Sequence, residues 1–361
     1  MNKPRVTHIT PALFGEQGVF GGAERYSLEL ARSMAKVVPT SLVAFGDVPK
    51  RFTTSEGLKV RVLGPAWRVR GQAFNRLHPG IVRAVAGADV VHCHQPRMLA
   101  SEMCALLARA TGRRAFASDL GAGGWSFSSR LNTDGWFHGH LHISEYSRQV
   151  AGHAKRAGAG VIYGGVDTEL FAPDPNVRRE PLVVFVGRLM PHKGVDVLID
   201  ALPAGMNLEL IGRPYHERFF ADLKRLAAGK RVTFRPDCTD FDIVRAYRRA
   251  ACVVLPSLYR DRYGNESKVP ELLGQTLIEG MACGAPGICT AVASLPEVVA
   301  DGRTGFVVPP NDAAALREKL RFLRDNESAV CELGAAGRAR VLEHFTWSTT
   351  VTRCLEAYAS Y

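Results

Sequence analysis

Long apolar runs are missing from this chain of 361 residues: no stretch approaches the ~18–20 apolar residues of a membrane-spanning helix. The first ten residues, Met1–Thr10, lead straight into a strand pattern and lack the apolar core of a signal peptide. Blocks of consecutive Lys and Arg, which mark nucleic-acid-binding arms, are also missing. These absences predict a cytoplasmic protein with no nucleic-acid partner.

Paired cysteines are missing as well. The eight cysteines include no Cys-x-x-Cys pair and mostly lie in apolar surroundings, which is typical of reduced, buried thiols. In His92-Cys93-His94 the imidazoles would share one face of a strand and the thiol the other, and no second ligand pair stands at zinc spacing. His138, His140 and His142 would also share one face, but nothing nearby in the sequence completes a metal site. The sequence therefore predicts no metal, and this second histidine run is given no role.

The composition is that of a globular protein with an excess of positive charge. Hydrophobic residues make up 46% and charged residues 22% of the chain, and the length suits two domains of ~100–200 residues. Lys+Arg number 46 against 35 Asp+Glu, a net charge of +11. This excess indicates an anionic ligand, a phosphorylated acceptor or peripheral association with the inner face of a membrane, although it could serve solubility alone.

Strand-length apolar runs alternate with helical stretches, which indicates βαβ units and parallel sheets. A glycine- and proline-rich stretch near residues 161–175 separates two such series. We expect an α/β protein with Rossmann-like domains over residues 1–167 and 181–345, a linker at 168–180, and an interdomain cleft between the carboxyl edges of two facing sheets. The predicted strands are Val6–Thr10, Thr40–Phe45, Val60–Leu63, Val90–His94, Arg114–Ser118, Leu141–Ile143, Gly160–Ile162, Leu182–Gly187, Leu208–Ile211, Val232–Phe234, Val253–Pro256, Gly287–Thr290 and Gly305–Val308.

Two glutamates bracket a predicted helix N-terminus in the second domain. A helix is expected from about Gln275 to Cys283, with Gly284 at its carboxyl end, and Glu271 and Glu279 lie just before it and one turn in. Such an N-terminus favours an anion such as phosphate, so neighbouring carboxylates would face something rich in hydroxyls, such as a ribose and a sugar. From this stretch alone, two solvated glutamates at a helix start are equally compatible with the pattern.

Two cations follow the first strand of the second domain. Arg188 and Lys193 lie in the loop that feeds the next helix, at the carboxyl end of the strand. The planar fork of Arg and the compact charge of Lys suit a diphosphate. Surface cations at a helix start are disfavoured by the helix dipole, which favours the functional interpretation.

The first domain offers a glycine-rich turn and a histidine at the same kind of sheet edge. Residues 14–22 contain four glycines between the first strand and a helix, which suits close approach of a phosphate, although the spacing is not Gly-x-Gly-x-x-Gly and a plain mobile loop remains open. His94 ends a strand run at the edge where open α/β sheets bind ligands. An exposed, idle histidine would suit that place equally.

Several motifs occur together and in order. They are Gly21-Gly22-Ala23-Glu24 after the first strand, Gly165-Val166-Asp167-x3-Phe171, Gly187-Arg188-x4-Lys193-Gly194, Glu271 and Glu279 separated by seven residues, and Pro296-Glu-Val-Val-x-Asp-Gly-x-Thr-Gly305. Together they resemble the retaining glycosyltransferases of family four, which have the GT-B architecture of two facing Rossmann-like domains. The resemblance covers nearly the whole chain.

The resemblance implies a role for each matching residue. Arg188 and Lys193 would clamp the diphosphate of a UDP- or GDP-linked sugar, Glu271 would face hydroxyls of the donor sugar, and His94 would lie at the acceptor side. Donor-binding residues would be Gly21, Gly22, Gly274, Gln275, Thr276, Leu277 and Glu279. The cationic clamp and the helix dipole would replace a metal, so neither a metal nor a separate cofactor is expected. Residues 346–361 would form a helix that crosses back onto the first domain.

Two departures from the family pattern concern the donor. Leu272-Leu273-Gly274 stands where the family has Gly-Phe-Gly, which leaves the identity of the sugar open. The segment 258–270 is longer than usual and could cover the donor or contact the acceptor.

The predicted function is transfer of a hexose-type sugar, with retention, to a glycan, lipid-linked or small-molecule acceptor. Alternatives are a nucleotide-sugar epimerase of the same architecture and a non-catalytic nucleotide-sugar-binding subunit, with a dinucleotide-dependent oxidoreductase more distant.

Overall fold

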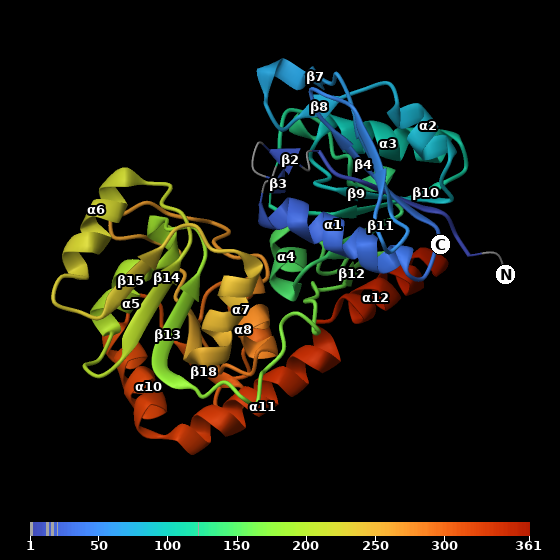
Figure 1. Ribbon diagram of the computed structural model, residues 1–361. Helices are drawn as coiled ribbons and strands as arrows, with labels where there is room; N and C mark the ends of the chain where they lie inside the picture. The colour runs from blue at the N-terminus through green and yellow to red at the C-terminus, as the bar shows by residue number, and fades with distance from the viewer. Residues whose placement is uncertain (1–2, 12–13, 16–17, 20, 122) are drawn as a thin grey trace. The chain divides into compact units, whose positions relative to one another are not determined.

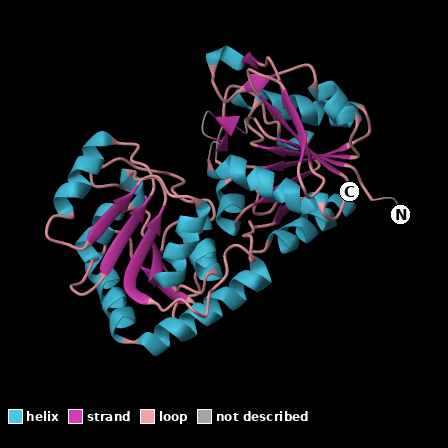
Figure 2. Ribbon diagram, viewed as in Figure 1, coloured by secondary structure: helices cyan, strands magenta, loops and turns pink. Residues whose placement is uncertain are grey.

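The computed structural model describes residues 3–11, 14–15, 18–19, 21–121 and 123–361. The chain divides into two compact units (Figure 1): unit 1 is Met1–Gly165 with Trp347–Tyr361, and unit 2 is Val166–Thr346. In each unit the strands of a largely parallel sheet lie between helices (Figure 2). The predicted α/β class is confirmed. Every helix within the described residues is too short or too polar to span a bilayer.

Unit 1 is built on an eight-stranded sheet in the order β12-β11-β10-β9-β1-β4-β6-β5. All strand pairs are parallel except β5 with β6. The strands are β1 (Val6–Ile9), β4 (Thr40–Phe45), β5 (Lys50–Thr53), β6 (Lys59–Leu63), β9 (Val90–His94), β10 (Arg114–Ser118), β11 (Gly139–His142) and β12 (Ala159–Val161), with short hairpins of β2 (Phe14–Gly15) and β3 (Gly18–Val19), and of β7 (Trp67–Arg68) and β8 (Arg76–Leu77). The α-helices are α1 (Gly22–Ala35), α2 (Ile81–Ala86), α3 (Leu99–Ala110), α4 (Glu145–Val150) and α12 (Trp347–Ala359).

Helix α12 comes from the end of the chain and packs against α1 in unit 1 (Figure 1). Tyr358 of α12 is 2% exposed, and its hydroxyl lies 2.7 Å from Nδ1 of His92 in β9. The Arg114 guanidinium donates to the Tyr358 carbonyl at 2.7 Å. These contacts bury the terminal helix against the sheet of unit 1.

Unit 2 is built on a six-stranded, fully parallel sheet in the order β15-β14-β13-β16-β17-β18. Its central strand β16 is a continuous apolar run whose residues are all buried, as expected for a parallel strand covered on both faces. The strands are β13 (Glu180–Val186), β14 (Asn207–Ile211), β15 (Val232–Arg235), β16 (Ala250–Leu255), β17 (Gly287–Thr290) and β18 (Gly305–Val308); the helices are α5 (Val195–Ala201), α6 (Glu217–Leu226), α7 (Asp240–Arg249), α8 (Gln275–Ala282), α9 (Leu295–Val298), α10 (Ala313–Asp325) and α11 (Glu327–His344).

The strand order of each sheet reverses direction at one point. The reversal lies between β1 and β9 in unit 1 and between β13 and β16 in unit 2. Ligands of open α/β sheets bind outside the carboxyl ends of the strands at such a switch point, because the loops there separate. The loops that follow β9, β13 and β16 are therefore the places to look for a site.

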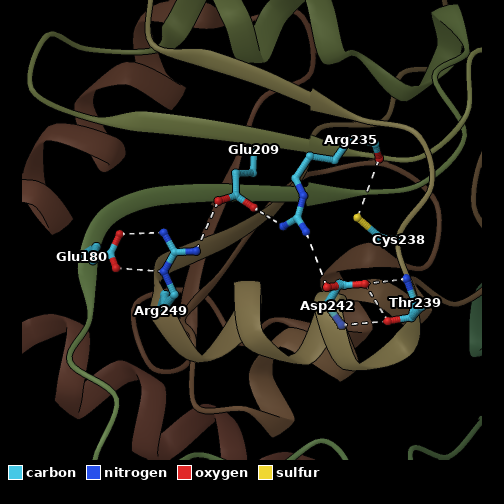
Figure 3. Close-up of polar contacts among 7 residues, drawn as sticks. All are labelled: Glu180, Glu209, Arg235, Cys238, Thr239, Asp242 and Arg249. Atoms are coloured by element: carbon cyan, nitrogen blue, oxygen red, sulfur yellow. Dashed lines mark hydrogen bonds and ion pairs between the residues drawn. The ribbon is translucent and has the colours of Figure 1, made fainter.

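A charged network joins α7 to the sheet of unit 2 (Figure 3). Arg249 donates to both carboxylate oxygens of Glu180 at 2.8 Å and lies 3.5 Å from Glu209. Arg235 donates to Glu209 at 2.8 Å and lies 3.8 Å from Asp242. The Arg249 hydrogen bonds lower the pKa of Glu180, and the hydrogen bonds from Thr239 lower that of Asp242. The network should therefore stabilise unit 2 only while these groups are ionised.

We expect Glu180→Gln to lower the free energy of unfolding at about pH 7 by no more than ~1 kcal/mol, because the pair is partly exposed, and to lower the melting temperature accordingly. The difference should shrink as the pH falls through the folded-state pKa of Glu180, below its ordinary value of 4.5, because the wild-type carboxylate is then protonated as well. Thermal melts of both proteins across the acid range measure this. Glu318→Gln, at an exposed carboxylate, is the control. A difference that stays constant with pH would contradict the prediction.

Candidate functional site

A glycine fixes how the loop after β13 lies against the loop after β16. The β13 loop passes through a 3-10 turn, η4 (Pro191–Lys193), to Gly194, whose φ is +66°. A Cβ at Gly194 would stand 2.0 Å from the Pro256 carbonyl oxygen, so only glycine fits. The Leu258 amide donates to the His192 carbonyl at 2.8 Å. These contacts hold Lys193 beside the segment that follows β16.

Lys193 and Glu271 form an ion pair in which both side chains are nearly buried. The Lys193 ammonium hydrogen-bonds to Oε1 of Glu271, and the two side chains are 13% and 11% exposed. Ser257 donates to the same carboxylate oxygen at 2.7 Å, and Thr290 donates to the Ser257 carbonyl at 2.6 Å. The charged donor Lys193 and the neutral donor Ser257 lie on different loops, and together they hold the Glu271 carboxylate in one position.

This pair changes one expectation from the sequence. Lys193 was predicted to meet an anion, whereas its charge already has a partner in Glu271. The ammonium has three donor hydrogens, so two are left for a further acceptor. Arg188 is exposed and makes no ion pair with any described residue; its guanidinium lies 5.8 Å from the centre of the Tyr215 ring. Arg188 is therefore the member of the predicted clamp whose charge has no ion-pair partner among the described residues.

Helix α8 begins where the sequence predicts. Gly274 precedes it with φ +84°, and no side chain caps this end of the helix. The positive φ favours glycine at Gly274, and a Cβ there would stand 2.8 Å from a Leu295 methyl group, which would have to shift. Thr276 and Leu277 belong to the first turn. The Leu277 amide donates to the Gly274 carbonyl at 3.0 Å, so the donors that an uncapped helix start directs toward the space before it lie ahead of Leu277. The predicted carboxyl end is confirmed as well, because Gly284 follows the helix with φ +77°.

Glu279 lies one turn into α8 and is 8% exposed. Its burial excludes the alternative of a freely solvated glutamate for this residue. Glu271 is also largely buried, so neither acid of the pair is a plain surface carboxylate.

The segment 258–270 is anchored to unit 2 by its tyrosines. The Tyr263 hydroxyl hydrogen-bonds to Asp222 of α6, and the Tyr259 hydroxyl accepts from the Ala293 amide at 2.8 Å. Arg262 lies 3.8 Å from Asp196 of α5. The extra length of this segment is thus used to cover α5 and α6, next to the loop that carries Glu271.

In unit 1, a chain of buried side chains orients His94 at the end of β9. His8 Nε2 lies 3.3 Å from the Met34 sulfur, and His8 Nδ1 lies 3.0 Å from His94 Nε2; both histidines are 0% exposed. A thioether only accepts, so neutral His8 carries its proton on Nε2 and accepts from His94 Nε2–H. Burial lowers the pKa of both histidines, which keeps them neutral. The alternative interpretation expected an exposed His94, and the burial of this side chain contradicts that exposure.

These hydrogen bonds leave one ring nitrogen of His94, Nδ1, for another partner. Its Nδ1 must then carry a lone pair, and it is buried with no hydrogen-bond partner in the part of the chain that the structure describes. A lone pair accepts, so the group that fits it is a hydroxyl or another donor.

Gly21 and Gly22 are exposed at the start of α1. Gly21 precedes the helix in an extended conformation, and a Cβ on Gly22 would meet no atom within 4 Å. The remainder of the predicted glycine-rich loop includes residues 16, 17 and 20, which lie outside the described residues.

The predicted site residues thus fall into two groups. Unit 1 holds His94, Gly21 and Gly22, and unit 2 holds the others. Within unit 2 the structure brings Lys193 and Glu271 into contact at the switch point. Ser257 was missed by the sequence analysis; its position directly after a predicted strand at the switch point was the available signal.

Comparison with known proteins agrees with the resemblance. Residues 167–340 match the family model described as glycosyl transferases group 1. The GDP-mannose-dependent alpha-(1-6)-phosphatidylinositol monomannoside mannosyltransferase of Mycolicibacterium smegmatis is 31% identical over 59% of this chain and 60% of its own length. The D-inositol 3-phosphate glycosyltransferase 1 of Catenulispora acidiphila is 29% identical over 95% and 91%. The chain spans 60%, 48% and 51% of the length of the first three curated relatives it matches.

Solved structures with the same fold cover the whole chain. Sucrose-phosphate synthase from Thermosynechococcus elongatus has a TM-score of 0.75 at 21% identity, over 99% of both chains. Anabaena HepE in complex with UDP and glucose has a TM-score of 0.74 at 19% identity, over 99% of this chain and 100% of its own. At this identity the likeness shows the fold, which is GT-B as predicted.

Proposed function

We propose that this chain transfers a hexose-type sugar from a UDP- or GDP-linked donor to an acceptor hydroxyl, on the basis of the match of residues 167–340 to the glycosyl transferases group 1 family model. Two of the similar curated proteins are named as a mannosyltransferase and a glycosyltransferase, which counts against an epimerase. The observation that carries the proposal is the Glu271 carboxylate, which Lys193 and Ser257 hold in place by hydrogen bonds. It lies at the carboxyl edge of the sheet, where the loop with Arg188 and the helix α8 also start.

Unit 2 binds the donor in this proposal. Arg188 and the two remaining ammonium hydrogens of Lys193 hold the diphosphate and stabilise the charge that develops on it as the glycosidic bond breaks. Gly274, Gln275 and Thr276 add backbone donors at the α8 N-terminus, whereas the Leu277 amide already donates to the Gly274 carbonyl at 3.0 Å. Glu279 accepts from ribose hydroxyls, and Glu271 accepts from hydroxyls of the sugar through its second carboxylate oxygen.

Unit 1 serves the acceptor side. The lone pair on His94 Nδ1 accepts a hydrogen bond from a substrate hydroxyl, and Gly21 and Gly22, having no side chains, let the donor phosphates approach. The acceptor attacks on the face from which the nucleotide leaves, which retains the anomeric configuration. The cations and the helix dipole do the work of a metal, so the reaction should continue in a chelator.

The acceptor is a glycan, a lipid-linked sugar or a small molecule. The excess of positive charge favours an acceptor that carries phosphate. The mannosyltransferase relative is named for a phosphatidylinositol acceptor, and others for an inositol phosphate. We place the reaction in the cytoplasm, with peripheral association at the inner face of the membrane when the acceptor is a lipid.

A thermal-shift screen of nucleotide sugars, followed by product analysis, tests the proposal. One nucleotide sugar at about a hundred times its Kd should stabilise the protein by ~2.7 kcal/mol. With an acceptor present, the matching donor should be consumed in a chelator, and NMR of the product should show the anomeric configuration of the donor.

Other outcomes would replace the proposal. Conversion of the donor without any acceptor would indicate an epimerase, and tight binding without turnover would indicate a binding subunit. Stabilisation by a nicotinamide cofactor would indicate an oxidoreductase.

A further inference from the structure

Unit 1 contains a cluster of one aspartate and three histidines, which we name the His140 cluster: Asp134, His140, His142 and His153. Asp134 begins the 3-10 turn η3 (Asp134–Trp136), His140 and His142 alternate along β11, and His153 follows α4. The sequence analysis expected nothing to complete a metal site near His140. That expectation is wrong, because the fold brings Asp134 and His153 to it from two loops.

The donor atoms of three of these residues converge. His153 Nε2 lies 3.1 Å from Oδ2 of Asp134, and one donor atom each from Asp134, His140 and His153 lies within 4.8 Å of the others. We propose that Asp134, His140 and His153 bind a divalent transition-metal ion of the Zn²⁺ class, with His142 as a positioning residue. Two imidazoles and a carboxylate form a common zinc ligand set, and bonds of ~2.0–2.1 Å place tetrahedral ligand atoms ~3.3–3.4 Å apart. The observed 3.1 Å is close to that spacing.

His142 supplies the support that a metal-bound imidazole needs. Its Nε2 lies 3.1 Å from Nδ1 of His153. A metal ion on Nε2 of His153 requires the proton of that ring to be on Nδ1, and His142 is placed to accept it. This hydrogen bond also aims Nε2 of His153 at the Asp134 carboxylate.

The cluster is open to solvent on its aspartate side. Asp134 is 39% exposed, which leaves solvent access for entry of the ion and for a water ligand.

A second group of histidines, His8, His92 and His94, does not fit a metal equally well. All three side chains are 0% exposed. The ring nitrogens of His92 lie 2.7 Å from the Tyr358 hydroxyl and 2.8 Å from the Ser118 hydroxyl, and His8 uses both of its own. One unpartnered nitrogen, on His94, cannot hold a metal by itself.

The bound ion would be structural. It would join η3, β11 and the loop after α4, three segments within twenty residues of sequence that are tied here mainly by the histidine hydrogen bonds. The inference does not rest on the proposed function, because none of the four residues has a part in it.

The test uses the full chain without a polyhistidine tag, stripped with a chelator and titrated with ZnCl2 by calorimetry, with melting temperatures recorded in parallel. We expect one ion per chain and a raised melting temperature. Asp134→Asn and His153→Gln should each weaken Zn²⁺ binding by about a hundredfold or more, and His142→Ala by ~10–100-fold. The surface variant His344→Gln, whose ring lies 3.5 Å from Glu343, should bind as the wild type does.

Zn²⁺ binding that is absent, or equally tight in Asp134→Asn and His153→Gln, would overturn the proposal. If these variants fail to fold, the wild-type protein still decides. Co²⁺ in place of Zn²⁺ should give the visible absorption of a four-coordinate site with nitrogen and oxygen ligands, and the weak spectrum of hexaaquo Co²⁺ would refute it.

Discussion

Arg188→Ala and Lys193→Ala are each expected to lower turnover by about a hundredfold or more, the scale of removing one preorganised charged donor at developing negative charge. Arg188 makes no ion pair with described residues, so its loss should leave the melting temperature nearly unchanged. Lys193→Ala also removes the charged partner of the largely buried Glu271 carboxylate and leaves it the hydrogen bond from Ser257, so this variant should lower stability as well as turnover. Steady-state kinetics and thermal melts of both variants separate these effects.

Two further variants sharpen the experiment. Glu271→Gln in the Lys193→Ala background removes the unpaired charge, so it should recover stability but not turnover, because the diphosphate still lacks its cation. Lys319→Ala removes a cation of α10 that pairs with Glu318, and should change neither quantity. Turnover that is unchanged in Arg188→Ala and Lys193→Ala would refute the diphosphate clamp.

The sequence predicted the strands that form the centre of each sheet, since these are continuous apolar runs buried on both faces. It missed β5, whose four residues are all exposed and include two cations, because an edge strand needs no apolar pattern. The hairpins of two-residue strands were missed too, since their pairing depends on the path of the loop and leaves no periodicity.

The candidate site was predictable residue by residue but not as a set of contacts. Motif spacing identified Lys193 and Glu271, but their ion pair joins residues 78 apart and depends on Gly194 fitting against Pro256. The hydrogen-bonded series Met34, His8 and His94 depends on the pairing of β1 with β9, whose register places His8 beside His92. Such contacts are set by register and packing, which a single sequence does not display.

The same limit explains why the sequence did not show the residues that join His140. Alternation along β11 predicted the shared face of His140 and His142. The other members of the cluster come from a 3-10 turn and from the loop after a short helix, and neither has a ligand spacing of a known zinc motif. Only the fold brings Asp134 and His153 to that face.

Gly194→Ala is expected to lower both the stability of unit 2 and turnover. The residue has φ +66°, which costs a non-glycine residue about 1–3 kcal/mol, and the new Cβ would stand 2.0 Å from the Pro256 carbonyl oxygen. Relief requires one of the two loops to move by about an ångström, which would separate Lys193 from Glu271. A displacement of that size can lower turnover by about a hundredfold.

Gly229→Ala is the matched control, because Gly229 also has a positive φ, +76°, but a Cβ there would meet no atom within 4 Å. Gly229→Ala should lose only the stability that a positive φ costs a non-glycine residue, and its turnover should be unchanged. Melting temperatures and kinetics of the two variants therefore separate strain from displacement. If Gly194→Ala loses no more stability than Gly229→Ala and keeps wild-type turnover, the two loops are free to adjust, and the position of Lys193 does not depend on their contact. If it loses activity well beyond its loss of stability, the close approach at Pro256 sets the distance between the cation and the carboxylate.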